Sequence, residues 1–209
     1  MTGAHAGAVM LKPFYQGKLD TFCAIYAVLN ALRLLYGIRV LKARDILNET
    51  LLGLASRPEA FRAVLTQETD YVSLVDSLLR IQARAFPLEI RAPFAPPEDG
   101  RPAPSGRTQT PDPDTFFATC RDWLAPGRGR AVVFRFLRSL TPDGGPMNRH
   151  WTTADRVDGD ILHLFDCSHE AEAILNIDRA SFVTNAAHVS ADRLLHIQPE
   201  SARFLRVPF

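Results

Sequence analysis

The residues best suited to chemistry in this sequence are a glutamine and a cysteine near the N-terminus. Gln16 precedes Cys23 by seven residues, and Cys23 opens an apolar stretch with helical spacing. A cysteine in the first turn of a helix feels the positive end of the helix dipole and unpaired backbone N–H groups, and both favour the thiolate over the thiol. Since a thiolate can attack a carbonyl carbon, we expect Cys23 to be a nucleophile.

A thiol nucleophile needs a general base, and the base needs a group that orients it. His150 is the best placed of the six histidines, because it begins a predicted strand directly after a loop rich in proline and glycine, 142–146. Asp166 ends the next predicted strand, sixteen residues later. His150 and Asp166 are therefore the expected base and orienting carboxylate.

The turn between these two strands decides whether the side chains meet. A two-residue turn over 158–159 would place His150 opposite Cys167 and leave Asp166 on the other face of the hairpin. A three-residue turn over 157–159, with its glycine in the left-handed conformation, would place His150 opposite Asp166. The sequence allows both turns, and we predict the three-residue one because only it makes a catalytic pair.

The first half of the chain is predicted to be helical. Apolar residues recur at helical spacing over 22–36, with Asp20 as the expected cap and Gly37 placed to end the helix. The nucleophile would thus lie at the start of a buried helix. Three further helices are predicted over 43–55, 58–67 and 70–85.

The second half is predicted to form strands, which follow a short strand over 88–91 and a helix over 112–124. Helices followed by an antiparallel sheet indicate an α+β fold. Residues 93–113 hold seven of the fifteen prolines, and we expect a surface loop or insertion there, within a single domain spanning 1–209. The predicted strands cover 131–137, 150–157, 161–166, 194–198 and 204–207.

Composition narrows the range of partners. The 209 residues carry a formal net charge of +1, which gives no electrostatic reason to expect nucleic acid or a membrane surface as a partner. Three cysteines are an odd number in a chain too long to depend on disulfides, so a reducing compartment is expected. The first eleven residues lack the basic start of a secretory signal. We expect a soluble cytoplasmic protein.

Gln16, Cys23, His150 and Asp166 follow the chain order of papain-like cysteine peptidases, which is glutamine, cysteine, histidine, then aspartate or asparagine. The chain most resembles the branch that includes bacteriocin leader-peptide peptidases, where the histidine begins one strand and the aspartate ends the next. The resemblance covers residues 15–30 and 150–166. It implies a papain-like fold, a peptide or protein substrate and no cofactor.

The resemblance also implies a role for each residue. Cys23 would attack an acyl carbon, and His150 would take the thiol proton and give it to the leaving amine. Asp166 would fix the imidazole tautomer and stabilise its cation. The side-chain amide of Gln16 and the backbone N–H of Cys23 would form the oxyanion hole.

Other interpretations of the same residues remain open. His163, Asp166, Cys167 and His169 are chemically acceptable zinc ligands, but their spacing matches no familiar zinc module and strand alternation divides them between two faces. We therefore expect no metal site.

The function also has alternatives. One sub-case of the peptidase hypothesis is a substrate that is the tail of a small ubiquitin-like protein. Transglutaminase-like acyltransferases use cysteine, histidine and aspartate in the same order, with an amine as acceptor. A non-catalytic binding module on this fold is a third hypothesis, disfavoured because all four groups have candidates.

Overall fold

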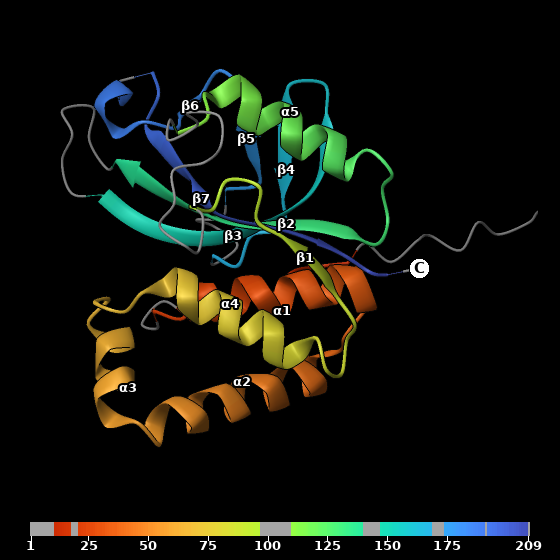
Figure 1. Cartoon of the computed structure of the whole chain (residues 1–209), viewed down its shortest axis with the longest axis vertical. Helices are drawn as coiled ribbons and strands as arrows, with labels where there is room; N and C mark the ends of the chain where they lie inside the picture. Colours follow the sequence, from red (N-terminus) through yellow and green to blue (C-terminus); the bar gives the residue numbers. More distant parts are fainter. Residues whose placement is uncertain are drawn as a thin grey trace, which may run out of the picture.

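The computed structural model describes residues 11–17, 21–96, 110–139, 147–168, 174–190 and 192–208. Within these ranges, four α-helices lie on one face of a seven-stranded sheet, and a fifth lies on the other (Figure 1). The α+β class predicted from the sequence is confirmed.

The helical layer begins with the helix that carries Cys23. This helix, α1 (Cys23–Tyr36), ends where Gly37 adopts a left-handed φ of 64° and donates its N–H to Arg33 O, as predicted. The side chain of Asp70 caps the last helix of the layer. None of the helices in the described ranges is both long and apolar enough to cross a bilayer. The other three helices are α2 (Val40–Ala55), α3 (Pro58–Leu65) and α4 (Tyr71–Gln82).

The sheet has the strand order β1-β7-β2-β3-β4-β5, with β6 beside β7. All pairs are antiparallel except β6 with β7. The helix α5 (Pro113–Leu124) covers the face opposite α1, and the short 3-10 helix η1 (Ala186–His188) precedes the last strand. The strands are β1 (Glu89–Arg91), β2 (Arg130–Ser139), β3 (Met147–Asp158), β4 (Ile161–Leu164), β5 (Asn176–Asp178), β6 (Phe182–Val183) and β7 (Leu195–Arg206).

The two strands predicted near the C-terminus are one strand, β7. Its pairing with β2 is interrupted between Val133 and Arg135, where the register shifts. Ser201 spans the irregular stretch, because its hydroxyl accepts from Arg135 N at 2.9 Å and donates to Gln198 O at 2.6 Å. A side chain thus replaces part of the backbone ladder, and the strand continues.

The turn between β3 and β4 is not the three-residue turn that we predicted. Asp158 pairs with Ile161, so the turn consists of Gly159 and Asp160, one position beyond the two-residue alternative. Gly159 has a φ of 56°, a conformation that suits glycine. A β-bulge at residue 155 then shifts the register by one position.

Neighbouring residues of β3 belong to different apolar cores. Trp151 lies in the core between the sheet and α1, whereas the ring of His150 lies 5.3 Å from that of Phe136 in the core beneath α5. Trp151 therefore points away from the face on which His150 lies. The proline-rich loop predicted over 93–113 is described at its two ends, where Phe94 packs 5.9 Å from Phe116.

An ion pair between a buried arginine and a partly exposed aspartate joins the helical layer to the sheet. Arg203 of β7 is 4% exposed, and its Nε and Nη2 donate to the two carboxylate oxygens of Asp76 on α4 at 2.5 and 2.8 Å. We expect Asp76→Ala to lower the free energy of unfolding by about 1–3 kcal/mol, because Nε and Nη2 of the buried guanidinium lose their acceptors while Nη1 keeps the carbonyls of Glu200 and Ala202. Urea unfolding measures this loss. Asp45→Ala removes an exposed carboxylate of α2 and is the control; an equal effect of both changes would contradict the prediction.

Candidate active site

The segment that carries Gln16 is fixed at two points. Asn30, in the third turn of α1, accepts from Phe14 N at 2.7 Å and donates to Phe14 O at 3.1 Å. Gln16 N donates to Cys167 O at 2.8 Å. These bonds hold Gln16 between α1 and the segment that follows β4.

Cys23 is the first residue of α1 and is half-buried. The N-cap residue is Phe22, and Cys23 follows it in the first turn, at the positive end of the α1 dipole. Two residues considered from the sequence, Asp20 and His169, lie outside the described residues, as does the loop 142–146.

His150 and Asp166 form a direct hydrogen bond. His150 Nε2 lies 2.7 Å from Asp166 Oδ1, and the two residues are only 8% and 0% exposed. Thr152 donates its hydroxyl to the same carboxylate oxygen at 2.8 Å. Ser168 donates its backbone N–H to Asp166 Oδ2 at 3.2 Å, and its hydroxyl lies 3.2 Å from His150 Nε2. The carboxylate is therefore held by three other residues.

The two side chains meet by a different route from the predicted register. Phe165 N donates to Thr153 O at 2.7 Å, which places Thr152 across from Asp166. His150 lies two residues from Thr152 on the same face of β3 and is the diagonal neighbour of the carboxylate. The bulge at residue 155 contributes to this alignment, because it sets the register beyond it.

Cys167 lies at the centre of the site, although sequence reasoning gave it no role there. Its Sγ is 3.8 Å from Gln16 Oε1, 3.8 Å from Cys23 O, 3.8 Å from His150 Nε2 and 3.5 Å from Trp151 O. Burial raises the pKa of Cys167 to about 12, so this thiol stays protonated and acts as a donor. The structure thus gathers Gln16, Cys23 and His150 around one buried side chain.

Thr152 and Ser168 were also missed, although the sequence contains a signal for Thr152. Side chains of a strand alternate between faces, so Thr152, two positions from His150 on β3, shares its face. Ser168 lies beyond the end of β4, where strand alternation gives no such signal.

The electrostatics of the pair favour a charged histidine. Burial alone would lower the pKa of His150, but hydrogen bonds to Asp166, Cys167 and Cys23, together with the charge of Asp166, raise it. Burial likewise opposes the charge of Asp166, but the hydrogen bond and charge of His150 outweigh it and lower the pKa of the carboxyl. An imidazolium–carboxylate pair is therefore the favoured state.

This pair makes stability depend on pH. The pKa of His150 is higher in the folded protein than in the unfolded chain, so its contribution is complete below the ordinary histidine pKa of about 6.5 and is lost as pH rises through the raised value. We expect the difference in free energy of unfolding between the native protein and His150→Gln to shrink from pH 6 to pH 9. Denaturant unfolding across this range checks it, and a constant or growing difference would contradict it.

Of the zinc-ligand set weighed from the sequence, His169 lies outside the described residues, and His163 is not grouped with Asp166 and Cys167. Nδ1 of His163 lies 3.3 Å from Arg156 Nη2, away from Asp166 and Cys167. A different trio, His150 with Asp166 and Cys167, has donor atoms within 4.8 Å of one another. In this trio the imidazole and the carboxylate are hydrogen-bonded to each other directly, so their donor atoms do not converge on a shared vacant point.

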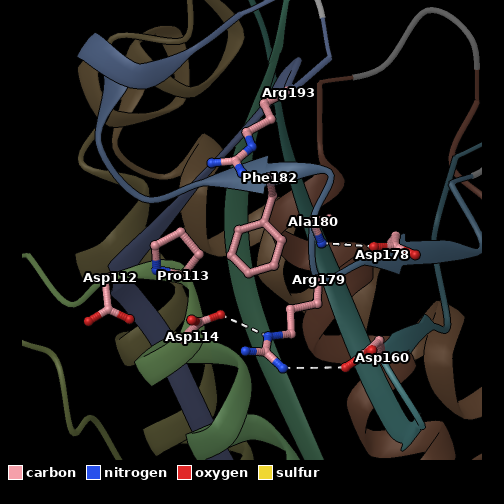
Figure 2. A pocket seen from close by; sticks show the side chains of 9 residues that line it. All are labelled: Asp112, Pro113, Asp114, Asp160, Asp178, Arg179, Ala180, Phe182 and Arg193. Atoms are coloured by element: carbon pink, nitrogen blue, oxygen red, sulfur yellow. Dashed lines mark hydrogen bonds and ion pairs between the residues drawn. The ribbon is translucent and has the colours of Figure 1, made fainter.

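A cavity of about 460 Å³ lies near the start of α5, at the other end of β3 from His150. Figure 2 shows Arg179 between Asp114 and Asp160, with contacts of 2.8 and 3.5 Å. In the same cavity Asp178 accepts from Ala180 N at 2.8 Å. These polar groups are engaged with each other and have no contact with the Cys23 site.

No family model matches this sequence, and no curated protein matches it either. The site is therefore interpreted from its own residues and geometry.

Proposed function

We propose that this protein is a cysteine peptidase with a papain-like fold, which hydrolyses an amide bond through Cys23, His150, Asp166 and Gln16. The observation that supports this best is the 2.7 Å hydrogen bond between the buried His150 and Asp166, at a site that also receives the start of α1. These are the base, the orienting group and the nucleophile that thiol hydrolysis requires.

The two imidazole nitrogens of His150 have different roles in the proposed mechanism. Nε2 of His150 is engaged by Asp166, which leaves Nδ1 for the thiol of Cys23. The charge of Asp166 and the hydrogen bond to Cys23 both stabilise the imidazolium, which is the form of His150 once it holds the thiol proton. The Sγ of Cys23 then attacks the acyl carbon, and His150 gives the proton to the leaving amine. Water then attacks the resulting thioester. His150 takes a proton from this water and gives it to the sulfur of Cys23 as the carboxylic acid product leaves.

The negative oxygen formed in this attack needs donors. Gln16 presents its Oε1 toward the protonated thiol of Cys167, which leaves its NH₂ group as the donor for the oxyanion. The backbone N–H of Cys23, in the first turn of α1, is the second donor. Both donors are fixed before substrate arrives, which is the condition for electrostatic stabilisation of a transition state.

Loss of the side-chain donor should slow the chemical step. We expect Gln16→Ala to reduce kcat about 10²- to 10³-fold with little change in KM, because the donor acts mainly on the transition state. Steady-state kinetics on a hydrolysed peptide measure this. Asn48→Ala removes an exposed amide from α2 and should leave kcat unchanged. A rise in KM alone would assign Gln16 to substrate binding instead.

Product analysis tests hydrolysis against acyl transfer. A peptide library is incubated with the protein in the presence and absence of a primary alkylamine, and the products are identified by mass spectrometry. The proposal predicts carboxylic acid products at a rate independent of the amine. Products that form only with the amine would indicate a transglutaminase-like acyltransferase, and no turnover by the folded protein would favour a binding module.

The proposed reaction needs no cofactor, since the four groups supply nucleophile, acid–base and oxyanion functions. All three cysteines are unpaired, in keeping with the reducing compartment expected for a thiol enzyme. A peptide or the tail of a small protein, ubiquitin-like proteins included, remains the proposed substrate.

A further inference from the structure

Two arginines lie on the helix-facing side of the sheet, at the end of the sheet where Cys23 lies. Arg135 of β2 is paired with Trp151 of β3, and its guanidinium carbon is 6.0 Å from the centre of the indole ring. Arg149 precedes Trp151 by two residues, so it lies on the same face. Arg149 is exposed and Arg135 is half-buried.

This cluster contains hydrogen-bond donors without acceptors. Arg135 Nε and Trp151 Nε1 are buried and have no partner among the described residues, although Trp151 is only 2% exposed. Buried donors normally have a hydrogen-bond acceptor. Because these two donors lie on facing residues, we expect a ligand to supply an acceptor for them. A carboxylate suits them, because it offers only acceptors, on two oxygens, and carries the charge that an arginine binds.

The cluster is close to the proposed nucleophile. In Figure 1 the N-terminal ends of α1 and α4 lie at the same end of the molecule as the end of β2 and the start of β3. Cys23 interacts electrostatically with both Arg135 and Tyr71, the first residue of α4, and Tyr71 also interacts with Arg149. Two arginines and the positive ends of the α1 and α4 dipoles therefore lie at the end of the sheet where Cys23 lies.

The acidic groups that face Arg135 do not neutralise it by direct contact. Asp70 and Glu200 both act on its charge, but no ion pair joins Arg135 to a described carboxylate. Asp70 is already used at the start of α4, where it accepts from Val72 N at 3.0 Å and from the hydroxyl of Ser73 at 2.6 Å. Arg135 thus retains donor capacity for a ligand.

We propose that Arg135 and Arg149 form an anion-binding subsite beside Cys23, which selects peptides with a carboxylate close to the scissile bond. This inference rests on the proposed peptidase function and adds the substrate class. The carboxylate comes from an acidic side chain or from the free C-terminus of the peptide, and these two sources share the same chemistry.

Binding to the Cys23→Ala protein tests the subsite without requiring turnover. The probes are fluorescent octapeptides with one glutamate at successive positions, their glutamine counterparts, and both forms with either a free or an amidated C-terminus. We expect one glutamate position, or the free C-terminus, to improve the dissociation constant about 10- to 100-fold, as for a hydrogen-bonded charge pair. The peptide series in which the dissociation constant improves identifies the source of the carboxylate.

The same peptides are then compared with substituted proteins. Arg135→Gln in the Cys23→Ala background should abolish the preference for the carboxylate and leave binding of the neutral peptides unchanged. Arg149→Gln should reduce the preference for the carboxylate. Because Arg149 is exposed, this variant can be tested even if Arg135→Gln does not fold. Arg128→Gln removes the same charge from an exposed turn and should preserve the preference.

Two results would overturn the subsite. One is equal binding of acidic and neutral peptides, and the other is a preference that survives both Arg135→Gln and Arg149→Gln. Failure of the subsite is distinct from failure of the proposed function. Hydrolysis by the native protein without charge preference would refute only the subsite, whereas arginine-dependent binding by a protein that never hydrolyses these peptides would refute only the peptidase.

Discussion

Replacing Cys23 by alanine is expected to abolish amide hydrolysis, with kcat reduced about 10⁶-fold, because the covalent route disappears with its nucleophile. The neighbouring buried thiol cannot take over, since burial raises the pKa of Cys167 and keeps it protonated. KM is of little use in this variant, so the measurement is the single-turnover rate on a peptide that the native protein cleaves.

The matched control for this change is Cys120→Ala. Cys120 is a fully buried cysteine of α5 in the core beneath that helix, so its loss removes a thiol from the face of the sheet opposite α1 and Cys23. We expect this variant to retain the native rate wherever it remains folded. Hydrolysis by Cys23→Ala at more than a trace of the native rate would show that another group is the nucleophile.

Replacing Asp166 by asparagine is expected to reduce kcat by about 10⁴-fold while the fold is retained. The amide keeps the shape of the side chain but removes the negative charge that raises the pKa of His150. Without it, burial dominates, the imidazolium becomes less stable, and the ring is no longer held in the tautomer that presents its free nitrogen to the thiol.

The dependence of kcat on pH measures this effect together with its sign. Loss of the charge lowers the pKa of His150, so the residual activity of Asp166→Asn should depend on a histidine that loses its proton at lower pH than in the native protein. Asp158→Asn changes an exposed carboxylate in the β3–β4 turn and is the control. Native kcat in the Asp166 variant would remove this carboxylate from the mechanism.

Local sequence signals were sufficient for the helix that carries the nucleophile. The glycine at residue 37 ends α1 in a left-handed conformation, and Asp112 with Pro113 begins α5, because caps and prolines act within one turn of the helix.

The hairpin of β3 and β4 could not be predicted in full from local sequence signals. The predicted pairing of His150 with Asp166 occurs, but the turn lies one position further along and a bulge at residue 155 alters the register. Turn and bulge are each allowed by several local sequences, and packing on both faces of the sheet chooses among them. A short strand such as β6, with two residues, has too little pattern to be recognised.

The position of Cys167 depends on contacts that no local pattern contains. It touches Gln16 and Cys23, which are more than 140 residues earlier in the chain, at separations of 151 and 144 residues. The position of Arg135 opposite Trp151 likewise follows from the β2–β3 register. Sequence reasoning therefore named the four proposed site residues but not the side chains that surround them.

The most direct test of the central claim is to map the residue that a thiol-reactive peptide electrophile modifies. Native protein, Cys23→Ala and His150→Ala are treated at neutral pH, and the adducts are located by peptide mass spectrometry. We predict a single rapid adduct on Cys23, its absence from Cys23→Ala, and much slower labelling of Cys23 in His150→Ala. Equal labelling of the native and Cys23→Ala proteins, or labelling of Cys23 at the native rate without His150, would contradict the proposed site.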